Sequence, residues 1–311
     1  MRKITLVGAG RVGEAAAQIL AKEELARELV LVGIRPGVAE GTALDLDECG
    51  TLFGFDTRVR GGTGLHLLSG SDLIIVSAGV PRKPGMSRSD VLAANLPVID
   101  AIADEARASA PDAIALIVTN PVDVLTYRFR LRTGWDRARV FGLSGVLDGA
   151  RMAAFIALET GLSVQDVRAL VIGGHGDSML PLPRFSSISG IPLEQFLAPP
   201  AIERIVTRTR GGGAEILALK KNSSAYDAPG AAIAAIVDAV AHDRHRLMAC
   251  VCCLEGEYGM RDLAMGVPAV LGAHGIERVV ELTLSDDETE RFARSAEAVR
   301  ADLATAASQR S

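Results

Sequence analysis

The first half of the chain alternates short apolar runs with longer amphipathic segments. The runs KITLVGAG, ELVLVGI, SDLIIVSAG and AIALIVTN are rich in Val, Ile and Leu and carry few charges, which is typical of strands buried on both faces. The segments between them place apolar residues three and four positions apart, as helices that cover a sheet do. We therefore predict an α/β fold with a doubly wound parallel sheet, the Rossmann arrangement.

The pattern changes after RVFGLSG, which ends at Gly145. A helix-like segment, VLDGARMAAFIALETG, is followed by irregular sequence with prolines, two further helical stretches and the strand-like runs LMACVCCLEG and RVVELTL. A last helix is predicted to begin at Ser285, because acidic residues fill its first turn. We expect two directly packed domains, residues 1–143 and a mixed α+β domain at residues 144–311.

Composition and charge argue against several classes of protein. The 311 residues are 49% hydrophobic and 23% charged, as in globular chains with an ample core. A net charge of −5 gives no reason to expect binding to nucleic acid or to an anionic membrane. The apolar run near the N-terminus is too short for an export signal, and no run approaches the ~18 residues of a membrane span. We expect a cytoplasmic protein.

Four cysteines raise the question of a metal site. Cys250, Cys252 and Cys253 lie in an apolar strand-like run, and Cys49 stands apart from them. No histidine or second cysteine pair follows at the spacing of metal ligands. We expect reduced, buried thiols and no metal.

A glycine-rich turn stands between the first predicted strand and the first predicted helix. VGAGRVGEAAA supplies Gly8 for a tight turn, Gly10 for close approach of a pyrophosphate, and Gly13 for close packing of helix on strand. The strand–turn–helix context makes this a dinucleotide site, although the motif alone is weak in a chain with 32 glycines.

The end of the second predicted strand decides which dinucleotide is expected. An acidic residue about 20 positions after such a turn usually binds the ribose hydroxyls, but this chain has Gly33 there and Arg35 two positions later. Loss of the carboxylate removes repulsion of a 2′-phosphate, and Arg35 offers it a cation. We expect the cofactor to be NAD or NADP, and we expect the site to accept NADP. The alternative is that Arg35 points into solvent and does not contact the cofactor.

Four further stretches carry polar residues suited to catalysis. The segment VPRKPGMSR holds Arg82 and Arg88 around a proline and a glycine, a composition suited to a mobile loop, and VTNPVD ends a predicted strand at Asn120. LDGAR places an aspartate and an arginine three residues apart on one helix face, and GGHGD sets a histidine among glycines.

In this order and combination, the stretches resemble the lactate/malate dehydrogenase family over essentially the whole chain. RKPGMSR is similar to the malate-acting members, whereas the lactate-acting members usually carry glutamine at the position of Arg82. The resemblance implies reversible hydride transfer between (S)-malate and oxaloacetate with a nicotinamide cofactor. It also implies a homo-oligomer, either a dimer or a tetramer.

The resemblance assigns a catalytic role to His175, the general base that takes the hydroxyl proton of the substrate. Asp148 would fix its tautomer and favour the imidazolium, and Arg151 would bind the carboxylate next to the reacting carbon. Arg88 would close in with its loop and stabilise charge on the carbonyl oxygen, while Asn120 holds the carbonyl group and the nicotinamide.

Arg82 would select the substrate by binding the second carboxylate. A monocarboxylate would leave its guanidinium desolvated and unpaired, which is an energetic penalty. Two alternatives remain open: a lactate or other 2-hydroxy acid dehydrogenase, and a sensor or scaffold that binds the dinucleotide without turnover. The predicted cofactor contacts are Gly8, Gly10, Arg11, Val12, Gly13, Gly33, Arg35, Asn95, Val118 and Asn120.

Overall fold

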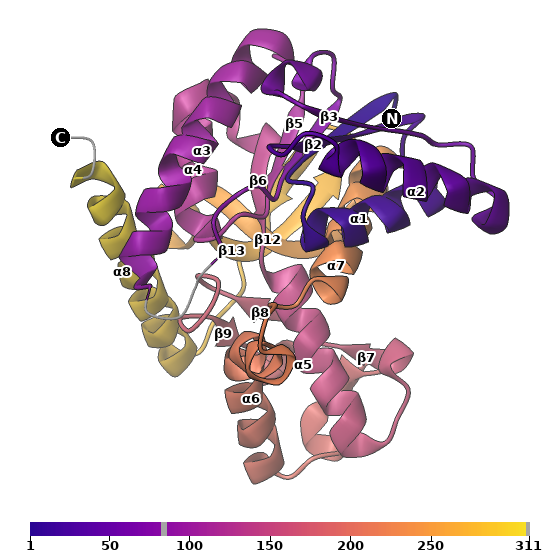
Figure 1. Cartoon of the computed structure of the whole chain (residues 1–311). Helices are drawn as coiled ribbons and strands as arrows, with labels where there is room; N and C mark the ends of the chain where they lie inside the picture. Colours follow the sequence, from indigo (N-terminus) through magenta and orange to yellow (C-terminus); the bar gives the residue numbers. More distant parts are fainter. Residues whose placement is uncertain (82–85, 309–311) are drawn as a thin grey trace.

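A computed structural model describes residues 1–81 and 86–308, and its centre is one large sheet (Figure 1). Within these residues the strand order is β14-β13-β12-β6-β5-β4-β1-β2-β3. The strands of this sheet are β1 (Lys3–Val7), β2 (Glu28–Gly33), β3 (Arg58–Thr63), β4 (Leu73–Val76), β5 (Ile114–Ile117), β6 (Val140–Leu143), β12 (Arg246–Glu255), β13 (Arg261–Gly272) and β14 (Gly275–Val279).

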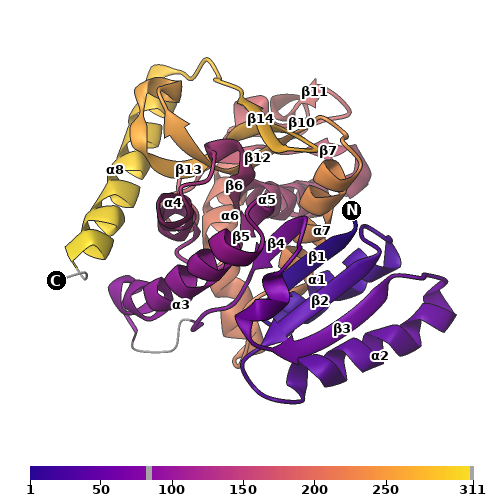
Figure 2. The same cartoon turned by 90° about the horizontal axis from the view of Figure 1, so that it is seen from above.

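The strands from β3 to β6 in this order are all parallel. Val7 at the end of β1 lies opposite Val32 in β2 and Val76 in β4, so the carboxyl ends of these strands meet at one edge of the sheet. Figure 2 shows β1, β2 and β3 side by side. The predicted doubly wound parallel sheet is confirmed.

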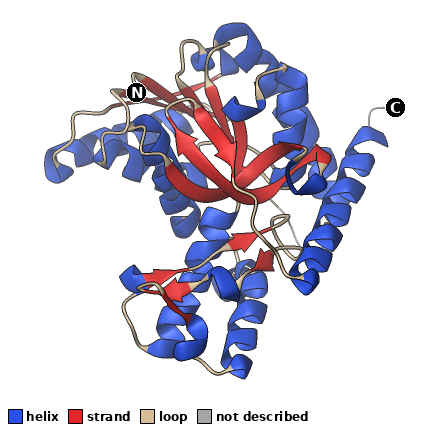
Figure 3. Cartoon of the chain, turned by 180° about the vertical axis from the view of Figure 1, so that it is seen from behind, coloured by secondary structure: helices blue, strands red, loops and turns tan. Residues whose placement is uncertain are grey.

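Helices cover both faces of the sheet (Figure 3). The helices of the described residues are α1 (Arg11–Lys22), α2 (Val38–Phe53), α3 (Arg88–Ser109), α4 (Val122–Thr133), α5 (Gly145–Thr160), α6 (Pro199–Lys220), α7 (Asp227–Ala241) and α8 (Asp286–Ser308), of which α6 lies away from this sheet. Alternate residues of each buried strand face opposite helical layers, because successive side chains of a strand point to opposite sides. In β4, Ile74 and Val76 pack with α3 and α4, whereas Leu73 and Ile75 pack with α1 and α7.

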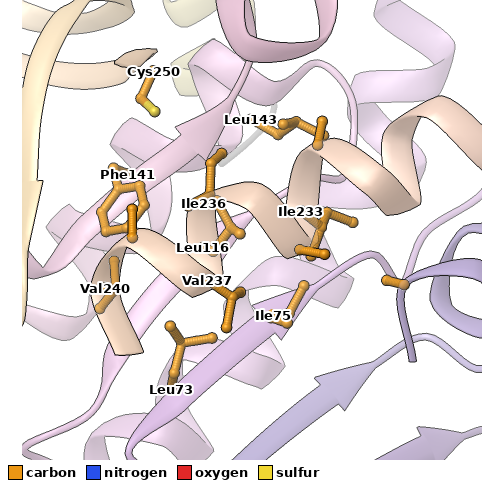
Figure 4. Close-up of a cluster of buried hydrophobic side chains, with 14 of the residues drawn as sticks. Leu73, Ile75, Leu116, Phe141, Leu143, Ile233, Ile236, Val237, Val240 and Cys250 are labelled. Atoms are coloured by element: carbon orange, nitrogen blue, oxygen red, sulfur yellow. The ribbon is translucent and has the colours of Figure 1, made fainter. Parts of the chain in front are cut away.

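Helix α7 comes from the second half of the chain yet packs beneath strands of the first half. Figure 4 shows Ile233, Ile236 and Val237 of α7 against Leu116 and Phe141 of β5 and β6. All five side chains are fully buried. Each such side chain contributes roughly 1.5–3 kcal/mol relative to exposure, so this contact fixes the two halves firmly to each other.

The sheet itself also crosses the predicted domain boundary. Strand β12 pairs antiparallel with β6, with Cys250 opposite Leu143, and β13 and β14 continue the sheet outward. The sequence indicated strands here but not their joining the first sheet. The division at residue 144 stays a prediction.

The prediction of a strand over the run RVVELTL is only partly correct. Strand β14 ends at Val279, so most of the run lies outside the sheet. Beyond this point the Val280 N–H still donates to the Pro268 carbonyl of β13 at 2.8 Å. The Tyr258 hydroxyl then donates to the Val280 carbonyl at 2.8 Å and accepts from the Leu282 N–H at 3.1 Å, so a side chain takes over the pairing of the backbone.

A smaller lobe lies below the sheet in Figure 1 and contains α5, α6 and short strands. The short strands are β7 (Val167–Arg168), β8 (Val171–Ile172), β9 (Leu180–Pro181), β10 (Ser187–Ile188) and β11 (Ile191–Pro192). Met152 and Ile156 of α5 and Ile205 and Val206 of α6 belong to its own buried apolar cluster.

The predicted helix start at Ser285 is confirmed, since its hydroxyl accepts the Glu288 N–H and its own N–H donates to the Glu288 carboxylate. The cysteines are free thiols. Three are buried as expected, and burial raises the pKa of Cys250 and of Cys253 to about 12, so both thiols stay protonated. Among the described residues, no helix is long and apolar enough to span a membrane.

Candidate active site

The glycine turn after β1 has the geometry that its sequence predicts. Gly8 has φ +122°, and a Cβ there would lie 2.5 Å from the Ala78 nitrogen. A Cβ at Gly13 would lie 2.0 Å from the Gly8 oxygen, so only glycine lets α1 start this close to β1. A Cβ at Gly10, in contrast, meets nothing within 4 Å.

This open space lies at the N-terminus of α1, where Gly10 provides no side-chain cap. The N–H groups of the first turn are therefore available to an anion, and the helix dipole favours negative charge there. The arrangement fits the pyrophosphate of a dinucleotide. Nearby, the Arg11 guanidinium lies 5.7 Å from the centre of the Tyr226 ring, and Val12 is half-buried against the core.

Gly33 ends β2 at the same edge, half-buried, and Arg35 is exposed two residues later. A Cβ at Gly33 would lie 3.3 Å from the Ala39 Cβ and 3.4 Å from the Ala9 Cβ, so the neighbours leave little room for a side chain. The turn after Gly33 thus offers a guanidinium to solvent, and position 33 offers no carboxylate.

Asn95 has a structural role that the sequence did not indicate. Its side-chain oxygen accepts the Val80 N–H at 2.7 Å, and its side-chain nitrogen donates to the Asn120 carbonyl at 2.8 Å. It is 1% exposed and joins the loops after β4 and β5. Asn120 is exposed and Val118 is half-buried, both after β5 at the carboxyl edge of the sheet. The cofactor contact of Asn95 stays a prediction.

His175, Asp148 and Arg151 come together in one buried cluster. The His175 Nδ1 lies 2.8 Å from one Asp148 oxygen, and Arg151 donates to the other oxygen at 3.1 Å. Asp148 is 1% exposed, Arg151 12% and His175 18%. Helix α5 supplies the aspartate and the arginine one turn apart, so their side chains lie on one face.

The electrostatics of the cluster favour a protonated imidazole. Burial lowers the pKa of His175, but the charge and hydrogen bond of Asp148 outweigh it, and the pKa is held above its usual value. The bond at Nδ1 leaves Nε2 as the nitrogen for a substrate proton. The group can donate a proton to a carbonyl oxygen or take one from a hydroxyl.

Asp123 is part of this cluster, although it was not among the predicted site residues. Its carboxylate accepts the backbone N–H of His175 at 2.9 Å, it is 1% exposed, and its charge also raises the pKa of His175. The available signal was its position in VTNPVD, in the first turn of the helix that starts at the catalytic edge. This bond brings the Asn120 and His175 segments together.

Two predicted substrate residues are not placed by the structure. Arg82 lies outside the described residues. Arg88 is the first residue of α3, after a capping box between Ser87 and Asp90, but its side chain is not among the described ones. The other site residues come from the loops at the carboxyl ends of β1, β2 and β5, from α1, α3 and α5, and from the loop after β8, which carries His175.

A second histidine cluster lies on the surface. The ligand atoms of Asp243, His245 and Glu277 all lie within 4.8 Å of one another, and all three residues are exposed. The His245 Nδ1 lies 2.9 Å from a Glu277 oxygen, so this histidine is paired with a carboxylate on the surface.

Comparison with known proteins covers both halves of the chain. Residues 2–142 match the lactate/malate dehydrogenase NAD-binding domain, and residues 145–309 match the α/β C-terminal domain of the same family. A malate dehydrogenase of Thioalkalivibrio sulfidiphilus is 60% identical over 303 residues, which cover 97% of this chain and 99% of that protein.

Solved structures of both family branches share the fold. The crystal structure of Cryptosporidium parvum malate dehydrogenase has a TM-score of 0.96 at 38% identity, covering 99% of this chain and 100% of the other. A lactate dehydrogenase of Cryptosporidium parvum, complexed with lactic acid and β-nicotinamide adenine dinucleotide, has a TM-score of 0.94 at 34% identity, covering 98% of each chain. The fold alone therefore does not separate the two activities.

Proposed function

This chain belongs to the lactate/malate dehydrogenase family, and on that premise we propose that it interconverts (S)-malate and oxaloacetate with a nicotinamide cofactor. The observation that carries the proposal is the buried cluster in which Asp148 bonds both His175 and Arg151. The choice of malate is supported by 60% identity to a malate dehydrogenase and by Arg82 in the loop RKPGMSR.

His175 moves the proton of the reaction. In oxaloacetate reduction its protonated Nε2 donates to the carbonyl oxygen as that oxygen gains negative charge. In malate oxidation the neutral Nε2 takes the hydroxyl proton. The nicotinamide supplies the hydride chemistry when bound. Asp148 holds Nδ1, so the exchanging proton is always at the nitrogen that faces the substrate.

Arg151 binds the substrate carboxylate next to the reacting carbon. Its guanidinium is largely buried and fixed by Asp148 on one side, which leaves other N–H groups to bind a carboxylate in a two-pronged way. We further infer that Arg88 stabilises the developing charge on the carbonyl oxygen and that Asn120 orients this group. The exposure of Asn120 at the catalytic edge supports its role.

Arg82 is proposed to bind the second carboxylate and to exclude monocarboxylates. Discrimination of about 10³ against pyruvate is reasonable, because pyruvate leaves this guanidinium without a charged partner. We expect Arg82→Gln to reduce kcat/KM for oxaloacetate far more than for pyruvate. Arg107→Gln, an exposed α3 variant, is the control that leaves both unchanged. Equal losses on both substrates would show that Arg82 is not the selector.

The proposed cofactor is NAD or NADP, with acceptance of NADP. Gly33 offers no carboxylate to repel a 2′-phosphate, and exposed Arg35 follows it. We expect Arg35→Ala to lower the ratio of NADPH to NADH activity while the NADH activity stays constant. A preference of the unmodified enzyme for NADH by a hundredfold would contradict this proposal.

The main alternative is a protein that binds the dinucleotide without turnover. Such a protein needs the glycine turn but not the Asp148–His175 bond in a buried cluster. A spectrophotometric assay with oxaloacetate and reduced cofactor distinguishes the two, since no NADH or NADPH consumption with any 2-oxo acid would favour the alternative. The cytoplasmic location and the homo-oligomeric state stay predictions.

A further inference from the structure

Helix α6 contains three consecutive glycines, Gly211, Gly212 and Gly213, in the middle of its 22 residues. Glycine is unfavourable inside a helix, and alanine would form the helix better at each position. The three positions have different surroundings. A Cβ at Gly211 meets nothing within 4 Å, and one at Gly213 has only a guanidinium nitrogen of Arg151, at 4.0 Å.

Gly212 is different because the arm of Arg151 lies directly on it. A Cβ at this position would lie 2.2 Å from the Arg151 Cδ, 2.8 Å from Nε and 3.2 Å from Cγ. These atoms are in the middle of the Arg151 side chain, whose guanidinium is held by the hydrogen bond to Asp148. A small change of side-chain conformation therefore cannot relieve the clash with an added Cβ. Gly212 is itself buried.

The register of α5 on α6 places these residues opposite each other. One turn beyond Arg151 in α5, the Phe155 ring lies 4.2 Å from the Arg208 guanidinium carbon, and Arg208 is one turn before Gly212 in α6. A further turn along, Glu159 pairs with Arg204 at 2.7 Å. The helices therefore run antiparallel with a contact at every turn, and the third contact in this series is Arg151 on Gly212.

We propose that Gly212 is a positioning residue, which lets Arg151 lie along α6 with its guanidinium held ready for the substrate carboxylate. This inference rests on the proposed function, in which Arg151 binds that carboxylate. At the other two contacts, a long side chain of α6 meets a side chain of α5. At the third contact α6 must have no side chain at position 212, because the Arg151 side chain fills that space. The guanidinium of Arg151 then bonds to Asp148, which belongs to α5 as Arg151 does.

The test compares Gly212→Ala with Gly211→Ala, which makes the same change one residue away in open space. We expect Gly212→Ala to raise KM for oxaloacetate by ~10–100-fold, the loss expected for one charge-assisted contact. The dissociation constant of NADH should not change. Gly211→Ala should keep the kinetics of the unmodified enzyme with an equal or higher Tm. Unmodified kinetics in Gly212→Ala would overturn the proposal.

The pH profile provides a readout that a general loss of packing would not move. Asp148 and Asp123 raise the pKa of His175, while the charge of Arg151 lowers it. Displacement of Arg151 should therefore move the histidine limb of oxaloacetate reduction to higher pH in Gly212→Ala. It should not move in Gly211→Ala. An unmoved limb in Gly212→Ala would count against displacement of the guanidinium.

A double variant covers the case in which Gly212→Ala does not fold. In Arg151→Ala the atoms at 2.2 Å, 2.8 Å and 3.2 Å are gone, so adding Gly212→Ala to it should lower neither Tm nor kcat/KM further. If Gly212→Ala lowers the Tm of Arg151→Ala as it lowers the Tm of the unmodified enzyme, the residue does not act through Arg151. The Tm comparison remains readable if the unmodified enzyme does not turn over oxaloacetate, a result that would refute only the proposed function.

Discussion

Replacing Asp148 by asparagine removes one buried charge and nearly preserves the shape of the side chain. The carboxylate now accepts from two donors, His175 at 2.8 Å and Arg151 at 3.1 Å. Asparagine has a single acceptor oxygen, so one donor loses its partner or faces an N–H group. With 1% exposure at this position, water cannot easily replace the lost bond.

The expected shift in pKa follows from the geometry. Two unit charges ~4 Å apart at an effective dielectric constant of ~20 interact by ~4 kcal/mol. Arg151 lies on the same carboxylate and offsets part of this attraction for His175. Removing the anion disfavours the imidazolium, so Asp148→Asn should lower the pKa of His175.

Oxaloacetate reduction needs the protonated histidine, so its rate falls as pH rises through the pKa of His175. In Asp148→Asn this fall should begin at lower pH, and kcat/KM should be reduced ~10–100-fold relative to the unmodified enzyme at pH values above the histidine limb of the unmodified enzyme. The rise of malate oxidation with pH should move in the same direction. The assay is the pH profile of kcat/KM in both directions.

Asp238 offers a matched control. It also bonds a histidine and an arginine, His242 at 2.9 Å and Arg244 at 2.7 Å, but on the exposed end of α7. Asp238→Asn should leave both pH profiles where they are. If Asp148→Asn also leaves the limb unmoved, the catalytic proton does not reside on the imidazole that Asp148 holds, and the reasoning fails.

Three smaller predictions follow from single contacts. Asp123→Asn keeps an acceptor for the His175 N–H but loses a charge, so the same limb should move to lower pH by less than in Asp148→Asn, as measured by the same profiles. Gly10→Ala should keep its Tm but raise KM for NADH, whereas Gly13→Ala should lower Tm, because only its Cβ meets backbone. Tyr258→Phe should lower the free energy of unfolding in urea by ~1–3 kcal/mol without altering kcat, since two backbone groups lose their hydroxyl partner.

The parallel strands could be predicted because their signal is local. Leu73, Ile74, Ile75 and Val76 are all fully buried, so β4 had to be apolar at every position to face helices on both sides. The glycine turn could also be predicted, because the spacing of its glycines between a strand and a helix is a local pattern, although Gly8 also lies against the backbone of distant Ala78. Gly13 against the Gly8 oxygen is the clearest case.

Pairings between distant segments left no such signal. The strand character of β12 was evident, but Cys250 lies opposite Leu143 only because the second half folds back onto β6. Asp123 contacts the His175 backbone across 52 positions of sequence. Gly212 became meaningful only once the register of α5 on α6 was known. Each of these depends on where two elements meet, which no short window of sequence contains.

The two Asp–His–Arg clusters show what the sequence could not say about chemistry. In α7, Asp238 and His242 are one helical turn apart, a spacing visible in the sequence, but their side chains are 27% and 48% exposed. Water there screens the charge and competes for both hydrogen bonds. Asp148 and His175 are far apart in sequence, and their side chains are 1% and 18% exposed. The same residue types therefore make a surface ion pair in one place and a proton-transfer site in the other, because burial lets one carboxylate set the charge and tautomer of its imidazole.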